Sequence, residues 1–438
     1  ENAEIEAVAA GGGGSAKVAV TGSLGINTIS NSTVAHASGS DLDASGDIMI
    51  KARDESEILS ISGAASGAGT AAVGAAGSYN SIGGEVRAEM SGGSADGANV
   101  RIDAERQGTL DVWAIAGSAA GTAGFAGSIA LNNAGGGTTA RIDDGAIVNA
   151  TGNAVVTAEA DDFIKSRAGS VAFGGSIGAA GGIAFNDIQS TTTAEVTGAN
   201  TSVTALGNGL ADLIDSGALS AYNNNQLPSQ QPLSGRQQKD SVKGVSVVAS
   251  STAMVENIAL SAAGGGNAGV AATVGIAMMG GSTTAQVTSG ATLNASLGSG
   301  DQEARVAAYH HDQIGSATGG AAIGGDAGIG GAADTAVVSH VTTANVDNAT
   351  LKANKAVTVD AGSTSKFEQA ILAVGGGTYA GLAGTIGVLL VDGTTQALVH
   401  KSDLESQGTI KVEATSDTEV DIDAGALAVS GVAGVGIT

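Results

Sequence analysis

The sequence predicts an all-β protein: an elongated parallel β-helix, or β-solenoid, built from Gly/Ala-rich repeats of about 53 residues with one inserted loop. Three observations support this prediction. Short stretches of alternating apolar and polar residues are bounded by turn residues, these stretches recur at a fixed interval, and the composition lacks the large side chains of a globular core.

Residues 111–164 contain one complete repeat. A Gly/Ala-rich apolar block at 112–131 is followed by a polar turn at 132–137, and alternating runs follow at 138–142 and 147–160. An alternation with a period of two is typical of short, half-buried strands. The blocks themselves indicate two strands around a glycine turn, which could be either a serial antiparallel hairpin or two faces of a coil joined at a corner.

The recurrence is measured by two independent markers. The alanine that closes the second alternating run recurs at intervals of 52, 56, 89, 59, 53 and 53 residues, at Ala52, Ala104, Ala160, Ala249, Ala308, Ala361 and Ala414. A Thr-Thr pair recurs at intervals of 54, 91, 59 and 52 residues, at Thr138, Thr192, Thr283, Thr342 and Thr394. Both markers place one long interval at the same point, so the chain is a repeat array with one insertion.

The composition limits how such repeats can pack. The 438 residues include 71 glycines, 2 prolines and one tryptophan, Trp113, and only 2% are aromatic. Small side chains cannot fill a wide core, so we expect sheets that approach closely, as in Gly/Ala silk. Inward-facing alanines in the blocks, among which Ala72, Ala119 and Ala383 are candidates, should then resist replacement by larger residues.

Both ends of the sequence are in the same phase of the repeat, since residues 3–14 match the pattern that begins at 420. We therefore expect an excerpt of a longer array, with repeats at 1–207 and 244–438 and the inserted loop at 208–243. If each repeat formed two or three coils about 4.8 Å apart, the array would be a rod on the order of 70–100 Å long.

The insertion of about 36 residues contains both prolines and a Gln-rich stretch. The spacing of Leu210, Leu213, Ile214 and Leu219 predicts one or two turns of helix around 210–221. The insertion is either a tolerated surface loop or a recognition loop on an otherwise uniform rod. Its candidate contact residues are Leu210, Leu213, Tyr222, Asn224 and Arg236.

Charge and cysteine content exclude several classes of protein. Acidic residues outnumber basic ones 42 to 18, and the net charge of −24 argues against a nucleic-acid partner and against anionic membrane surfaces. The chain has no cysteine, so it has neither disulfides nor a thiolate site. No segment resembles a signal peptide or a membrane-spanning helix.

Candidate chemical sites are few. The only histidine pair, in His310-His311-Asp312, is expected at a solvated corner, because adjacent strand residues point to opposite faces and could share a metal only at a turn. The acidic pairs Asp143-Asp144 and Asp161-Asp162 are expected near turns. The acidity would permit calcium, but the Gly-rich nonapeptides of calcium-binding rolls are absent, so we expect no cofactor.

Other catalytic and phosphate-binding patterns are missing. The glycine runs at 11–14, 264–266 and 375–377 lack the Lys-Ser ending of a phosphate loop. No serine–histidine–acid order stands out among the 5 histidines. We therefore expect a protein that is not an enzyme.

The pattern Leu42-x-Ala44-x-Gly46-x-Ile48-x-Ile50-x-Ala52, repeated from Leu351 and from Leu404, resembles the coils of filamentous-haemagglutinin-type exoproteins. The Gly/Ala blocks are similar to the arrays of large bacterial surface adhesins, including leukotoxin-type exoproteins. The resemblance covers nearly the whole chain. It implies a right-handed parallel β-helix from a secreted or cell-surface protein of a Gram-negative bacterium, exported by an outer-membrane β-barrel partner.

The resemblance implies a structural or adhesive role, with a cell-surface or matrix receptor, or self-association into fibres, as the interaction. Two other functions stay open. A leukotoxin-like segment could act on membranes, although the aromatic girdles of transmembrane strands are missing. A β-helix enzyme that degrades polysaccharides would need a distinct carboxylate cluster and aromatic sugar platforms.

Overall fold

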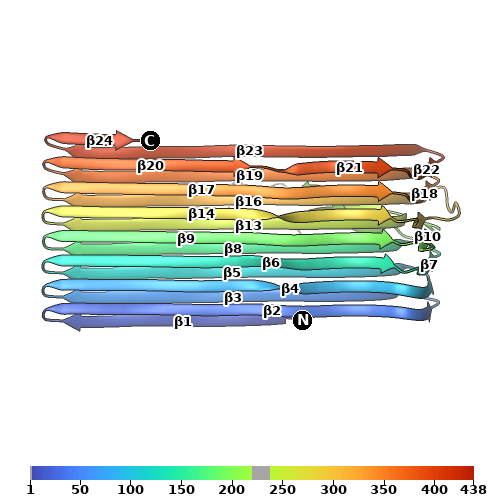
Figure 1. Cartoon of the computed structure of the whole chain (residues 1–438), viewed down its shortest axis with the longest axis horizontal. Helices are drawn as coiled ribbons and strands as arrows, with labels where there is room; N and C mark the ends of the chain where they lie inside the picture. Colours follow the sequence, from blue (N-terminus) through green and yellow to red (C-terminus); the bar gives the residue numbers. More distant parts are fainter. Residues whose placement is uncertain (1, 220–236) are drawn as a thin grey trace.

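A computed structural model of the chain describes residues 2–219 and 237–438. Every regular element in the described residues is a β-strand, and none of them is a helix. The long strands lie in parallel sheets whose order follows the sequence from the N-terminal to the C-terminal rung (Figure 1). The prediction of an all-β, parallel, solenoid-like fold is confirmed.

One sheet, here called the first sheet, contains eight parallel strands. In order along the stack these are β1 (Asn2–Ser15), β3 (Ile48–Ala68), β5 (Val100–Ala120), β8 (Ala154–Gly174), β13 (Gly244–Gly265), β16 (Glu303–Gly324), β19 (Ala356–Gly377) and β23 (Thr409–Ser430).

The second sheet faces it and is also parallel. Its long strands are β2 (Val18–Asp43), β4 (Ala71–Gly97), β6 (Ala123–Asp143), β9 (Ile177–Thr197), β14 (Ala268–Thr288), β17 (Ala327–Asp347), β20 (Ala380–Val391), β21 (Thr394–His400) and β24 (Ala433–Ile437). A row of short parallel strands continues it: β7 (Ile147–Ala150), β10 (Ser202–Ala205), β15 (Thr292–Leu293), β18 (Thr350–Ala353) and β22 (Asp403–Ser406).

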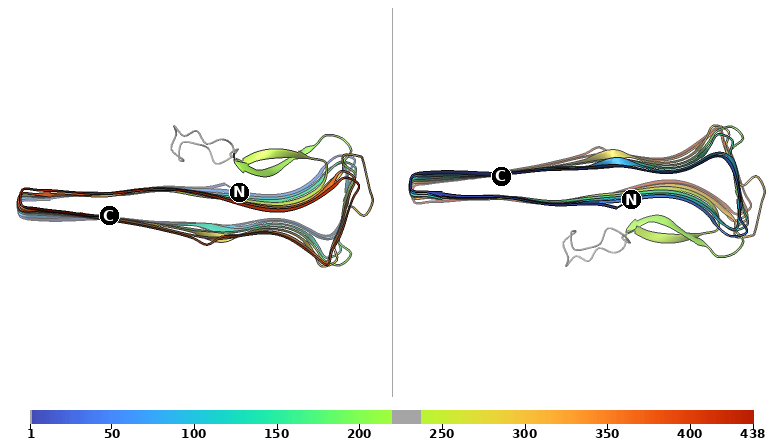
Figure 2. Two further views of the ribbon diagram at one scale, coloured as in Figure 1. Left: turned by 90° about the horizontal axis from the view of Figure 1, so that it is seen from above. Right: turned by 90° about the horizontal axis from the view of Figure 1, so that it is seen from below.

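Each coil therefore follows one path. A strand of the first sheet ends in a two-residue turn such as Gly69-Thr70, a strand of the second sheet returns, and a short strand leads back to the first sheet. Figure 2 shows that the two sheets lie close together at the turns, here called the tip. They spread apart at the opposite end, where the short strands form an end wall.

The strand register shows that each repeat makes one coil. Ile48 pairs with Val100 and Val100 with Ala154, offsets of 52 and 54 residues, so the expectation of two or three coils per repeat was wrong. Eight strands about 4.8 Å apart give a stack only about 34 Å high, whereas 21-residue strands extend about 70 Å. The molecule is elongated along its strands. Its small inward side chains favour a coil with two closely packed sheets over a coil with a wide, prism-shaped interior.

Most of the repeat markers are structural partners. Ala52 lies beside Ala104 in the first sheet, and Thr283 lies between Thr192 and Thr342 in the second. Two assignments were wrong: Thr342 pairs with Thr395, not with Thr394, and Ala104 pairs with Ala158, not with Ala160. The alternation around Ala158 offers two alanines two residues apart, so both fit the inward pattern and only the pairing decides between them.

The interior changes character from the end wall to the tip. Along β3 the inward residues are Ile50, then Asp54, then Ile58, then Ser60 and finally Ala64. The isoleucines belong to two separate aliphatic clusters, and Ala64 belongs to a cluster made only of alanines. Polar side chains separate these clusters, so the interior is a series of alternating apolar and polar belts.

The walls approach most closely near the tip. A Cβ atom placed on Gly74 would lie 2.4 Å from the carbonyl oxygen of Gly117 across the interior, so only glycine fits there. The Gly/Ala blocks are thus two faces of a coil joined at a corner. Ala72 and Ala383 point inward and are buried, as expected, but Ala119 is exposed on the outer face.

One polar belt is a ladder of asparagines along the second sheet. The Nδ2 atom of Asn27 donates to Oδ1 of Asn80 (2.8 Å), Asn80 donates to Asn132 (3.0 Å) and Asn132 donates to Asn186 (2.9 Å). The side chain of Asn132 also donates to Ser166 on the opposite wall (3.0 Å). The four strands β2, β4, β6 and β9 are therefore hydrogen-bonded to one another inside the molecule, in addition to their backbone pairing.

The close walls lead to a stability prediction. We expect Ala72→Leu to reduce the free energy of unfolding by about 1–3 kcal/mol, because the added methylenes have no space between the walls. The matched control is Ala119→Leu, in the same type of block but on the outer face, which should be nearly neutral. Equal effects in chemical denaturation would contradict close wall packing.

The ladder leads to a second prediction. Asn80→Ala leaves Asn27 with Ser60 as its acceptor but without Asn80, and it leaves the Oδ1 of Asn132 without its donor. We therefore expect a loss of about 2–4 kcal/mol in thermal or chemical unfolding. Asn257→Ala is the control, since Asn257 is equally buried in the same belt but its amide has no hydrogen-bond partner. If the two variants lose the same stability, the ladder contributes nothing specific.

Candidate functional site

The insertion forms a β-hairpin against the outer face of the first sheet. Strand β11 (Asp212–Leu219) pairs antiparallel with β12 (Gln237–Val242), and Asp212 lies opposite Val242. The predicted helix around 210–221 was therefore wrong for the described residues. The spacing of Leu210, Leu213 and Ile214 fits a helix, but it also fits a strand in which Ile214 points down and Leu213 points outward.

The predicted contact residues divide into two groups. Leu210 and Leu213 lie at the start of the hairpin, and their exposed fractions are 91% and 57%. The remaining candidates, Tyr222, Asn224 and Arg236, lie outside the described residues. The two leucines are thus large apolar side chains presented to solvent by an element that is itself fixed to the sheet.

An apolar cluster holds the hairpin down. Ile214 and Val242 of the hairpin are buried against side chains of the first sheet, namely Val155, Val248, Ala307 and Tyr309. At Gly217 the backbone has a positive φ of 79°, and a Cβ atom there would lie 2.4 Å from the Tyr309 ring. Glycine is therefore needed at this position for the hairpin to lie flat.

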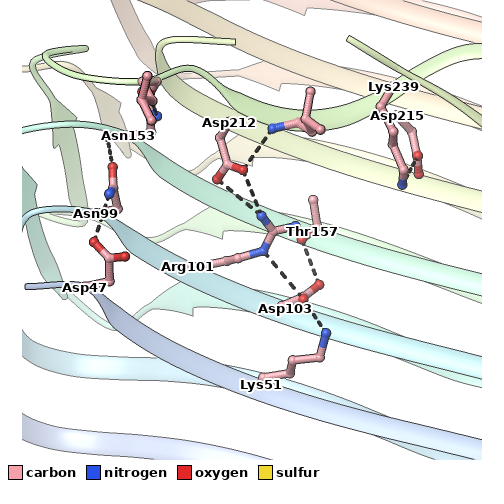
Figure 3. Close-up of polar contacts among 12 residues, drawn as sticks. Asp47, Lys51, Asn99, Arg101, Asp103, Asn153, Thr157, Asp212, Asp215 and Lys239 are labelled. Carbon is pink, nitrogen blue, oxygen red and sulfur yellow. Dashed lines mark hydrogen bonds and ion pairs between the residues drawn. The ribbon is translucent and has the colours of Figure 1, made fainter. Parts of the chain in front are cut away.

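Ion pairs also hold the hairpin in place, and Figure 3 shows those of Arg101 with Asp212 and of Lys239 with Asp215. Arg101 of β5 donates to both carboxylate oxygens of Asp212 (3.2 Å each), and Arg305 of β16 lies 3.3 Å from Asp240. Within the hairpin, Lys239 pairs with Asp215. The hairpin is consequently tied to strands from rungs on both sides of its own insertion point.

The side chains of the first sheet near the hairpin are themselves held by hydrogen bonds. Asp103 accepts hydrogen bonds from Lys51 (3.0 Å) and Thr157 (2.9 Å), which bridges three neighbouring strands (Figure 3). Asn99 donates to Asp47 (2.8 Å), and Asn153 donates to the backbone carbonyl of Leu210 (2.9 Å). These contacts fix the position at which the chain leaves the solenoid, beside a hollow of about 490 Å³.

Carboxylates outnumber cations where β11 and β12 cross β8. Glu159, Asp161 and Asp215 gather around Lys239, whose ammonium lies 3.6 Å from Glu159. Burial, followed by the charge of Asp215, raises the pKa of Glu159 to about 7. Burial and the charge of Glu159 also raise the pKa of Asp161 well above its ordinary value. Burial alone would lower the pKa of Lys239, but Glu159 and Asp215 outweigh it and the net shift is upward.

The histidine pair does not lie at a solvated corner. His310, His311 and Asp312 lie in the middle of β16 and are buried, with exposed fractions of 1–4%. Inside the solenoid, Nδ1 of His310 lies 2.6 Å from the Ser251 hydroxyl, and its Nε2 lies 2.7 Å from an Asp312 carboxylate oxygen. The sequence could not reveal this alignment, because Ser251 belongs to the preceding coil.

This serine–histidine–aspartate alignment is sealed from solvent. The rings of His310 and His340 stack with centroids 3.3 Å apart, and His340 is hydrogen-bonded to Thr283 (2.9 Å). Burial lowers the pKa of His340 to about 2, so its ring is neutral. A nucleophile buried in this way cannot meet a substrate, and we interpret the cluster as a polar cross-link between the walls.

The acidic pairs have different surroundings. Asp143-Asp144 lies at the end of β6, where a turn was expected, but Asp161-Asp162 lies within β8 and not near a turn. Asp162 points inward and accepts two hydrogen bonds from Arg106, of 2.7 and 2.5 Å. In the described part of the chain, no group of three or more histidine, cysteine or acidic side chains could hold a metal ion.

Comparison with known protein families, with curated proteins and with solved structures finds no match for this chain. Residues 2–219 and 237–438 contain no helix that is long and apolar enough to cross a membrane. The functional interpretation therefore depends on the geometry of the hairpin and of the surfaces around it.

The raised carboxylate pKa values predict how docking of the hairpin depends on pH. A group whose pKa is higher in the docked state stabilises that state fully below its undocked pKa and loses this effect as the pH rises through the docked value. For Glu159 the window runs from about pH 4.5 to about 7. Amides of β11 and β12 should therefore be better protected from hydrogen exchange at pH 5.5 than at pH 8, after correction for intrinsic rates.

Glu159→Gln should weaken this dependence, because one of the two carboxylates with a raised pKa is removed and only the contribution of Asp161 remains. Asp103 does not interfere, because its lowered pKa places its own effect below pH 4. Glu57→Gln is the control, since Glu57 is an exposed carboxylate of β3 away from the hairpin. Protection that stays constant between pH 5.5 and 8 in the unmodified protein would refute the prediction.

Proposed function

We propose that this chain is a structural and adhesive segment of a large secreted or cell-surface exoprotein of a Gram-negative bacterium, and that the hairpin is its recognition element. The observation that carries the proposal is the anchored insertion. On a repeating surface, one hairpin is held by an apolar cluster and by ion pairs, and it presents Leu210 and Leu213 to solvent.

The anchoring distinguishes this hairpin from a loop that is merely tolerated. A tolerated insertion needs no contacts beyond its two ends, whereas here Ile214, Val242 and Gly217 are each fitted to the first sheet. Holding exposed side chains on a rigid element lowers the entropy that binding would otherwise cost. A fixed pair of exposed leucines is thus suited to a receptor with an apolar pocket.

The charge limits the partner. A net charge of −24 favours a receptor on a cell surface or in the matrix whose contact surface is neutral or basic, and it disfavours nucleic acid. The outer-membrane exporter belongs to the same proposal. The solenoid would serve as the rigid support that carries the hairpin away from the cell.

The alternative of a polysaccharide-degrading enzyme receives less support. Such an enzyme needs two accessible carboxylates flanking the sugar and aromatic platforms beside them. The inward pair of Arg106 and Asp162 is buried, and Glu159 is paired with Lys239 of the hairpin, with no aromatic platform described beside it. The alternative of a membrane-active segment has one observation in its favour, the exposed apolar side chains near the tip, such as Phe125 and Ile129.

A binding assay tests the proposal. Binding of the purified chain to cultured epithelial cells and to immobilised matrix proteins should fall at least fivefold when Leu210 and Leu213 are both replaced by serine. Leu372→Ser is the matched control, since Leu372 is 55% exposed on the same sheet but lies on β19, away from the hairpin. Equal binding by the two variants would show that the hairpin is not the recognition element.

A further inference from the structure

The outer face of the second sheet is apolar near the tip. Here it is called the blade face, and it comprises the outward side chains of the first ten residues of β2, β4, β6, β9, β14, β17 and β20. Phe125, Ile129, Ile177, Ile183, Ile329 and Leu382 are among them, and each is 40–44% exposed. The large aliphatic side chains of these rungs thus point to solvent, while glycine and alanine point inward.

The blade face carries no charge. Its seven strands contain no outward-facing Asp, Glu, Lys or Arg in their first ten residues, and the single acid there, Asp334, points inward and is buried. The net charge of −24 is therefore carried by other surfaces. A neutral area in so acidic a protein is a place where two surfaces can meet without electrostatic repulsion at the contact.

The area is large enough for a stable interface. Seven strands about 4.8 Å apart and ten residues of about 3.3 Å each give a face of about 29 by 33 Å, or about 950 Å². A stable interface typically buries about 800 Å² per partner, and the largest apolar patch of a soluble monomer is about 300–600 Å². The hairpin does not cover this face, because it lies on the first sheet.

We propose that the blade face docks onto the blade face of a second copy of this chain, sheet against sheet. Two flat sheets pack face to face about 10 Å apart when their side chains interdigitate. Rows of mostly large apolar side chains, such as those of Phe125 and Ile129, flank a row made only of glycine and alanine, which includes Gly127 and Gly181, so the face has both ridges and a groove. A two-fold arrangement makes one such surface complementary to itself.

A lipid surface is the rival occupant and is less well matched. Aromatic side chains, which anchor proteins at the membrane interface, make up only 2% of this chain. The acidic surroundings of the face would also be repelled by anionic lipids. This docking specifies the surface through which an adhesive segment would associate with itself, and only that biological role rests on the proposed function. Its test uses no receptor, so the two proposals can fail separately.

Sedimentation equilibrium of the full chain at 5–100 µM, in about 20 and about 500 mM NaCl, tests the proposal. We expect a dimer whose dissociation constant falls at high salt, because salt screens the repulsion between the acidic surfaces outside the contact. Ile183→Lys should raise the dissociation constant at least tenfold. Thr191→Lys is the matched control, since it adds the same charge to the outer face of the same strand, eight residues from Ile183, and should change the constant less than twofold.

Ile129→Thr serves as a second variant without added charge and with strand propensity retained, and it should weaken the dimer severalfold. Far-UV circular dichroism establishes that each variant is folded. A chain that stays monomeric at 100 µM in both salts overturns the proposal, as do equal effects of Ile183→Lys and Thr191→Lys. The face would be assigned to lipid instead if the protein were monomeric in solution, bound to phosphatidylcholine vesicles, and lost this binding in the Ile183→Lys variant.

Discussion

The close approach of the two walls near the tip is the constraint on which the rest of this structure depends. At Gly124 a Cβ atom would lie 2.2 Å from the carbonyl oxygen of Phe173, and Gly74 faces Gly117 in the same way. The space between such walls is filled mostly by glycine, alanine, serine and threonine. The larger aliphatic residues of the same strands, such as Ile129 and Ile183, therefore point outward. This reverses the usual distribution of a globular protein and creates the exposed apolar face.

A flat interior of small residues has little power to fix strand register. A one-residue slip would reverse every side chain, but a two-residue slip along alternating alanines, such as Ala158 and Ala160, would change little. The polar belts supply what the small residues lack. The asparagine ladder and the pair formed by Arg106 and Asp162 each join atoms on specific rungs, and a slip would leave them buried without partners.

The sequence predicted the features that local pattern determines. The alternation predicted the strands, and the interval between markers such as Thr192 and Thr283 placed the insertion. It did not predict one coil per repeat, because the number of coils depends on how closely the walls approach. It predicted one or two turns of helix around 210–221, because the pairing partner that makes the described part of this segment a strand begins at Gln237. The burial of His310 was missed because its contacts, Ser251 and His340, belong to other strands.

The hairpin changes how the stack behaves as a unit. In a repeat array each coil is coupled only to its neighbours, so local openings can be independent. The hairpin contacts β5 through Arg101, β8 through Val155, β13 through Val248 and β16 through Arg305 and Tyr309, which spans four successive strands of the first sheet. A load on the hairpin is thus shared by several coils. The blade face lies on the opposite sheet and near the opposite end, so binding at the hairpin and docking at the blade face can occur together without competing for surface.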